Sequence, residues 1–125
     1  MEFEQTWYSV KCVFRHPHLA NALSQPLEEG EVLYEERVVI LKASTLDEAI
    51  TLGEAEANAY AGDGGDIEYT GFLSAYHMFA EEMKSGTEVY SLMRSSTLDA
   101  DPFLDRYYDD GSERTQHFED AGMDV

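Results

Sequence analysis

A stretch of alternating hydrophobic and polar residues near the N-terminus has the pattern of a half-buried β-strand. It covers Trp7–His16, with the sequence WYSVKCVFRH. One face carries Tyr8, Val10, Cys12 and Phe14, and the other carries Trp7, Ser9, Lys11, Val13 and Arg15. The stretch therefore predicts a first strand with a mainly apolar face and a mixed face.

Three later segments also predict strands. Tyr34–Ala43 is charged in its first half and apolar on both faces in its second, so we expect this second half to lie in the centre of the sheet. Ile67–Phe79 predicts a third strand, with Gly71 as a bulge or a packing point. Thr87–Arg94 predicts a fourth.

The segment between the second and third strands predicts a long helix. Thr45 followed by Glu48 fits a capping box, and Gly62 is a typical stop signal. Apolar residues recur at helical spacing and form one stripe. Gly53 lies on this stripe, which indicates a close approach of the helix to the sheet.

A short second helix is predicted near the C-terminus. Asp101 is expected to be its N-cap and Pro102 its first residue, with Phe103 and Tyr107 on one side. We expect residues 1–111 to form a single compact domain, followed by a polar, flexible tail at 112–125.

The order of these elements predicts a two-layer α+β fold. We expect a four-stranded, mainly antiparallel sheet of β-β-α-β-β order, the long helix on one face, and a short C-terminal helix. The opposite face would be uncovered and would include some of Trp7, Val13, Phe72 and Tyr76. Such a face is either an oligomer or partner contact, or is covered by the loop after the first strand and the terminal helix.

The charge of the chain narrows its possible partners. Among 125 residues, 26 are acidic and 8 are Lys or Arg, for a formal net charge of −18. This balance argues against binding to DNA, RNA or an anionic membrane, which need a basic surface. It is compatible with a basic partner, with divalent cations, or simply with high solubility.

Cysteine content and the N-terminal sequence predict a cytoplasmic protein. Cys12 is the only cysteine, so the chain forms no internal disulfide, as suits a reducing compartment. The N-terminal residues MEFEQTWYSV lack the basic and apolar regions of a signal peptide. The longest purely apolar run, Val38–Leu41, is too short to span a bilayer.

No motif in the sequence predicts a catalytic residue, a cofactor or a metal site. His16 and His18 supply two imidazoles, whereas a metal site needs three or four converging ligands. Cys12 alternates with apolar residues and is expected to be a small buried hydrophobe. The glycine-rich stretch Gly62–Asp66 is acidic and lacks the lysine of a phosphate-binding loop, so we interpret it as a flexible connection.

The two arginines beside apolar strand segments are expected to form structural ion pairs. If the strands are antiparallel neighbours, Arg37 or Arg94 meets a carboxylate across them. Arg94 is interpreted as an anchor for the terminal helix, and the alternative is that it binds an external carboxylate through its planar guanidinium. The carboxylates it would hold are Asp99, Asp101 or Asp105.

Four stretches together resemble a small bacterial family known as domain of unknown function 4288. They are WYSVKCVFRH, YEERVVILKA, GTEVYSLMRSS and LDRYYDDG, spread from Trp7 to Gly111. The resemblance implies a bacterial source and a compact single domain. It implies no activity, cofactor or catalytic residue.

Three hypotheses for the function follow. The first is a non-enzymatic domain that binds a protein, for example an immunity-type inhibitor of a basic partner, through acidic residues: Glu35, Glu36, Asp101, Asp105, Asp109 and Asp110. The second is a ligand-binding or enzymatic domain that uses the uncovered sheet face, with Trp7, Tyr69, Tyr76, His77, Tyr90 and Arg94 as its members. A homodimer formed through that face is a third possibility.

Overall fold

The structure of the protein, a computed structural model, describes residues 4–18 and 27–108. The chain divides into two units, Met1–Ser91 and Leu92–Val125. Three strands and the long helix belong to the first unit, and the short helix belongs to the second. Asp109, Asp110 and the predicted tail at 112–125 lie outside the described residues, so a domain boundary after Gly111 stays a prediction.

The sheet of the first unit is antiparallel, with the N-terminal strand at its centre. β1 (Thr6–His16) pairs with β2 (Leu33–Ala43) on one side and with β3 (Glu68–His77) on the other. The strand order is β2-β1-β3. The predicted α+β class and the antiparallel pairing are therefore confirmed, with three strands in the described sheet.

Two strand predictions are wrong. Thr87–Arg94 forms no strand, and its Glu88 and Tyr90 instead contact the sheet through their side chains. β2 lies at an edge of the sheet rather than at its centre, and its Val38 and Ile40 are 47% and 41% exposed. The apolar second half of β2 therefore reflects an exposed apolar surface and not burial between two neighbours.

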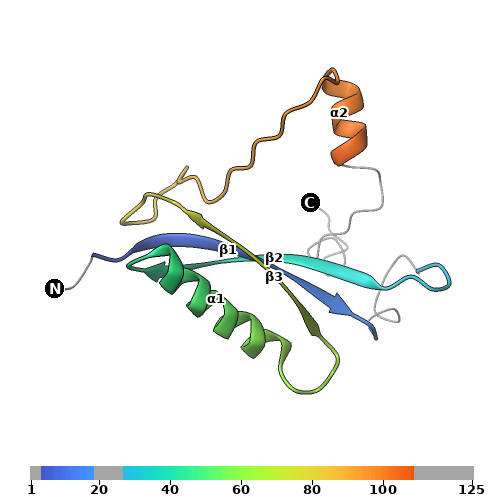
Figure 1. Ribbon diagram of the computed structural model, residues 1–125, viewed down its shortest axis with the longest axis horizontal. Helices are drawn as coiled ribbons and strands as arrows, with labels where there is room; N and C mark the ends of the chain where they lie inside the picture. The colour runs from blue at the N-terminus through green and yellow to red at the C-terminus, as the bar shows by residue number, and fades with distance from the viewer. Residues whose placement is uncertain (1–3, 19–26, 109–125) are drawn as a thin grey trace. The chain divides into compact units, whose positions relative to one another are not determined.

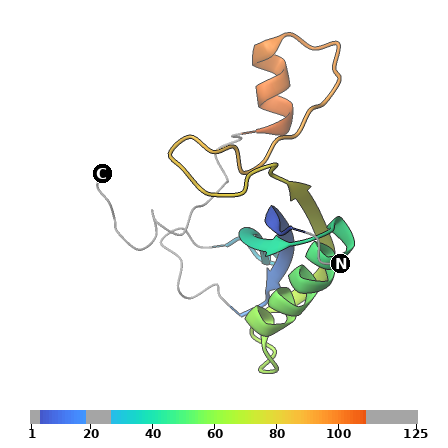
Figure 2. The same cartoon turned by 90° about the vertical axis from the view of Figure 1, so that its left-hand side faces the viewer.

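The long helix α1 (Leu46–Ala61) has the predicted ends. The Glu48 amide donates to the Thr45 hydroxyl at 3.1 Å, and the Glu48 carboxylate accepts from the amide of Ser44 at 2.5 Å. Gly62 ends the helix at a φ of 66°. Both views show α1 lying along one face of the sheet (Figures 1 and 2).

The core lies between α1 and this face of the sheet. Tyr8, Val10, Cys12 and Phe14 are buried, and so are Ala49, Gly53 and Ala57 of α1. A Cβ atom on Gly53 would lie 2.8 Å from Cγ1 of Val10, which confirms the predicted close approach. The small residues of α1 thus let the helix axis come near the sheet.

A bulge interrupts the pairing of β1 with β3. Cys12 lies opposite Leu73 whereas Phe14 lies opposite Tyr69, so three residues of β3 face Val13 alone. Gly71 lies in this stretch with a φ of 91°, a conformation that favours glycine. The predicted bulge at Gly71 is confirmed.

The second unit contains α2 (Ala100–Tyr107). Its N-cap is Asp99 and not the predicted Asp101, so Pro102 is the third helical residue instead of the first. None of its residues is buried. The rings of Phe103 and Tyr107 are in contact, with centroids 4.9 Å apart, as their spacing predicted.

Candidate functional site

The sheet face opposite α1, called the open face below, gathers aromatic and cationic side chains. Alternation along the strands places a defined set of residues on it: Trp7, Ser9, Lys11, Val13 and Arg15 of β1, Tyr34, Glu36, Val38, Ile40 and Lys42 of β2, and Phe72, Ser74 and Tyr76 of β3. Within the first unit, the open face is therefore the first candidate for a binding surface.

An aromatic group lies on the open face around Tyr76. Its ring contacts that of Tyr90 at a centroid distance of 5.9 Å, and the Lys11 ammonium lies 5.4 Å from the Tyr90 centroid. The Tyr76 hydroxyl donates a hydrogen bond to the Glu88 carboxylate, which raises the pKa of Tyr76. Lys11 also forms an ion pair with Glu36 at 3.0 Å, so its charge is already compensated.

A second group on the open face surrounds Trp7. The Lys42 ammonium lies 5.2 Å from the Trp7 ring centroid, at the typical distance of a cation–π contact. Ser9, the next residue on this face, is 1% exposed, and its hydroxyl has no hydrogen-bond partner among the described residues.

The structure separates the residues that the sequence grouped into a ligand site. Trp7, Tyr76 and Tyr90 are associated with the open face, but Tyr69 and His77 lie on the face covered by α1. His77 stacks on buried Tyr8 at 4.8 Å, and Tyr69 packs on Phe14 at 5.5 Å. Adjacent strand residues point to opposite faces, so Tyr76 and His77 cannot line one site in this strand.

Arg94 belongs to the second unit, where it contacts aromatic rings. Its guanidinium lies 4.8 Å from the Tyr107 ring centroid and 6.0 Å from that of Tyr108. Among the described residues no ion pair joins it to Asp99, Asp101 or Asp105. The predicted contact of Arg94 with the terminal helix is present, but Arg94 contacts the rings of Tyr107 and of the C-cap residue Tyr108 and not a carboxylate.

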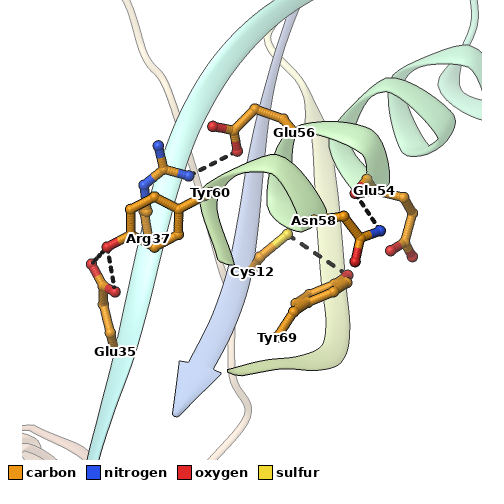
Figure 3. A network of polar contacts seen from close by, with 8 residues as sticks. All are labelled: Cys12, Glu35, Arg37, Glu54, Glu56, Asn58, Tyr60 and Tyr69. Atoms are coloured by element: carbon orange, nitrogen blue, oxygen red, sulfur yellow. Dashed lines mark hydrogen bonds and ion pairs between the residues drawn. The ribbon is translucent and has the colours of Figure 1, made fainter. Parts of the chain in front are cut away.

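A polar network joins β2 to α1 on the covered face (Figure 3). Arg37 forms an ion pair with Glu56 at 2.8 Å, and its guanidinium lies 3.8 Å from the Tyr60 ring centroid. The Tyr60 hydroxyl contacts both carboxylate oxygens of Glu35, at 2.9 and 3.1 Å. The ion pair expected for Arg37 thus exists, but its partner is on the helix rather than on a neighbouring strand.

Glu35 connects this network to β1 as well as to α1. Besides Tyr60, it contacts Nε2 of His16 at 2.7 Å. Its place on the covered face separates it from Glu36, which is on the open face. Tyr60 is not among the residues predicted for a site, although Glu56 and Tyr60 are four residues apart on the predicted helix and therefore neighbours on its surface.

The acidic residues predicted as a partner surface do not form one patch. Glu35 and Glu36 lie on opposite faces of β2, as described above. Asp101 and Asp105 are exposed on α2 in the second unit. Asp109 and Asp110 lie outside the described residues.

The covered face keeps its ionisable hydroxyl and thiol groups protonated. Burial and the Glu35 carboxylate raise the pKa of Tyr60 to about 12. Burial also raises the pKa of Cys12, and burial together with a hydrogen bond to Glu54 raises that of Tyr69. The Cys12 thiol contacts the Tyr69 hydroxyl at a sulfur–oxygen distance of 3.9 Å. At neutral pH these groups are hydrogen-bonding groups and poor nucleophiles or bases.

Two other kinds of site are absent from the described residues. Residues 4–18 and 27–108 contain no group of three or more His, Cys, Asp or Glu side chains placed to hold a metal ion. Across the same residues, no helix has the length and apolar character needed to cross a membrane.

Comparison with known proteins adds no relative. No family model matches the chain, and neither a curated protein nor a solved structure matches it. The resemblance to domain of unknown function family 4288 therefore stays a prediction.

Proposed function

We propose that this protein is a non-enzymatic binding domain whose acidic surface docks a basic protein. The observation that carries the proposal is the internal neutralisation of three of the four Lys and Arg side chains of the sheet, with Lys42 as the exception. Lys11, Arg15 and Arg37 each form an ion pair with a carboxylate of the same unit, at 3.0, 2.9 and 2.8 Å. These cations are therefore not free to meet an acidic partner.

The excess negative charge is left on exposed carboxylates. The net charge is −18, and among residues 4–18 and 27–108 the three Lys or Arg ion pairs involve Glu36, Glu68 and Glu56. Exposed carboxylates outside the four described ion pairs occur before β2, at the start of α1, in the loop after α1, after β3 and on α2: Glu28, Glu29, Glu31, Asp47, Asp63, Asp66, Glu81, Glu82, Asp101 and Asp105. Such a surface steers a basic partner toward the protein and raises its association rate.

The chemistry of the covered face supports binding over catalysis. The elevated pKa values of Cys12 and Tyr60 keep both groups protonated at neutral pH, so neither is an activated nucleophile. A small, acidic, cytoplasmic bacterial protein that neutralises a basic protein, as an immunity protein does, fits these properties by analogy of class. The buried thiol of Cys12 is compatible with a reducing compartment.

Salt-dependent capture from a bacterial lysate tests this proposal. The tagged protein is exposed to lysate at about 0.05 M salt and washed at about 1 M, where charges are screened beyond a few ångströms. We expect a basic protein to be released by salt, and its purified form to bind with a Kd that rises with salt. No salt-released basic protein, or binding that is insensitive to salt, would contradict the proposal.

Two charge-neutralised variants locate the surface and control for folding. The quadruple change D63N/D66N/E81Q/E82Q removes exposed carboxylates from the first unit, and D101N/D105N removes them from α2. All six side chains are exposed, so circular dichroism and urea unfolding should change little. We expect the quadruple variant to lose affinity for the captured protein, and the α2 variant to show whether the second unit contributes.

A second candidate function rests on the aromatic group of the open face. The rings of Tyr76 and Tyr90 offer a surface for a planar aromatic ligand, whose carboxylate would have to compete with Glu36 for the Lys11 ammonium. Binding of an aromatic carboxylate such as benzoate, followed by NMR shifts of the Tyr90 ring, tests this candidate. Unshifted Tyr90 signals at saturating benzoate would reject this ligand class.

A further inference from the structure

The outer edge of β2 is long and regular. All 11 residues of β2 pair with β1, from Leu33 opposite His16 to Ala43 opposite Thr6, without a bulge. Among the described residues no strand pairs with its other side, and no backbone hydrogen bond outside the ladder with β1 involves β2. In an antiparallel edge strand, alternate residues direct their amide and carbonyl groups away from the sheet, ready to pair with another strand.

The side chains along this edge form an apolar centre flanked by opposite charges. Val38 and Ile40 are 47% and 41% exposed on the open face. Glu36 precedes them on the same face, with a side chain that is 68% exposed, and exposed Lys42 follows them. The order along the open face is therefore acidic, apolar, apolar, basic, which is complementary to itself when reversed.

We propose that β2 pairs antiparallel with β2 of a second copy of this chain, about a two-fold axis at Val39. In this register Val38 lies opposite Ile40 of the other copy, and Glu36 lies opposite its Lys42. The two-fold axis repeats each pair, so the dimer is closed and joins the two sheets into one. Apolar pairs and opposite-charge pairs directly across an antiparallel ladder are both favourable.

Neighbouring registers fit less well. An axis at Val38 would place Glu36 opposite apolar Ile40, and an axis at Ile40 would place Lys42 opposite Val38. Of these three axes, only the one at Val39 places Glu36 opposite Lys42 and also places Val38 opposite Ile40. This interface uses a strand edge and is independent of the exposed carboxylates that carry the proposed docking of a basic protein.

Charge reversal across the axis tests the interface. Light scattering after size exclusion, over a range of protein concentrations, should show a dimer for the wild type. E36K places Lys opposite Lys42, and K42E places Glu opposite Glu36, so each should raise the dimer Kd by roughly tenfold or more. The double variant E36K/K42E should restore the wild-type value. A monomeric wild type, or single reversals without effect, or failure of the double variant to restore the dimer, would overturn the proposal.

E36K also removes the ion pair between Glu36 and Lys11, so a second test of the strand register is needed that changes no charge. Cysteine cross-linking provides it. A chain carrying V38C is mixed with a chain carrying I40C under mild oxidation, and native Cys12 is buried. Facing residues in a ladder have Cα separations that a disulfide can bridge. We expect the mixture to form cross-linked dimers faster than either variant alone. Faster cross-linking of V38C alone, or none in the mixture, would reject the axis at Val39.

Discussion

Gly53 of α1 and Val10 of β1 approach so closely that a methyl group between them would overlap. A Cβ atom on Gly53 would be 2.8 Å from Cγ1 of Val10 and 3.0 Å from Cδ1 of Leu73. Gly53→Ala should therefore destabilise the fold: overpacking costs about 1–3 kcal/mol, and the gain in helix propensity returns only about 1 kcal/mol. We expect a net loss of about 1 kcal/mol in urea unfolding.

A double-mutant cycle with Val10→Ala isolates the overlap. Val10 is 1% exposed, so it has little room to move aside. When its side chain is shortened, the Gly53→Ala change should cost less than in the wild type. If Gly53→Ala lowered the free energy of unfolding equally in both backgrounds, the contact between Gly53 and Val10 would not be the cause of the destabilisation.

Stability should fall at high pH because of Tyr60. Its pKa is raised from 10.0 in the unfolded chain to about 12 in the folded protein, by burial and by Glu35. Above pH 10 the unfolded state loses this proton while the folded state keeps it, so the free energy of unfolding decreases between pH 10 and about 12. Below pH 10 the contribution is fully present.

Tyr60→Phe provides the control for this pH dependence. The variant loses the hydrogen bond to Glu35, which should cost about 1 kcal/mol near neutral pH. It should also show a shallower decrease of stability above pH 10, with the remainder due to groups whose pKa values are raised in the same direction: Cys12, Tyr69 and Tyr76. A slope identical to that of the wild type would show that Tyr60 does not titrate differently in the two states.

The Cys12 thiol should react slowly in the native protein. It is 5% exposed, and burial raises its pKa, so both access and thiolate fraction are low. We expect labelling by iodoacetamide at pH 8 to be at least tenfold slower in the native protein than in urea. The variant C12A/S85C, whose cysteine replaces an exposed serine, should label quickly in both conditions. Fast native labelling of Cys12 would contradict its burial.

α2 should be the less protected of the two helices in hydrogen exchange. It has 8 residues, none of them buried, whereas α1 packs on the sheet through buried Ala49, Gly53 and Ala57. A short helix without packing is marginal in water, so its amides should exchange orders of magnitude faster than those of α1.

Arg94→Ala should speed the exchange of the α2 amides further by removing a cation–π contact with Tyr107, worth about 0.5–1 kcal/mol. Arg94→Lys should preserve part of it, and equal protection of the two helices would contradict this account.

The elements with local signals were predictable from the sequence. Thr45, Glu48 and Gly62 define the ends of α1 by local hydrogen bonds and backbone conformation, and alternation along Trp7–His16 defines β1. The neighbours of a strand depend on contacts distant in sequence, which alternation does not encode. For that reason Thr87–Arg94 looked like a strand and β2 looked central.

The candidate sites were less predictable because they depend on the register of the strands. The sequence grouped Tyr69, Tyr76 and His77 by residue type, but strand alternation and the bulge at Gly71 distribute them over two faces. The partners of Glu35 come from β1 and α1, and the spacing of charges along β2 alone gives no indication of either.

The bulge at Gly71 also limits how the chain can change in length. Between the pairs Cys12–Leu73 and Phe14–Tyr69, β1 advances by two residues and β3 by four, so the bulge holds two additional residues. An even number preserves the alternation, and Tyr69 and Leu73 therefore both reach the core side. Removing a single residue there would turn Tyr69 outward and Glu68 inward beneath α1. Insertions and deletions at this point should be tolerated in pairs and rejected singly, which is a parity rule for any homologous chain that keeps this sheet.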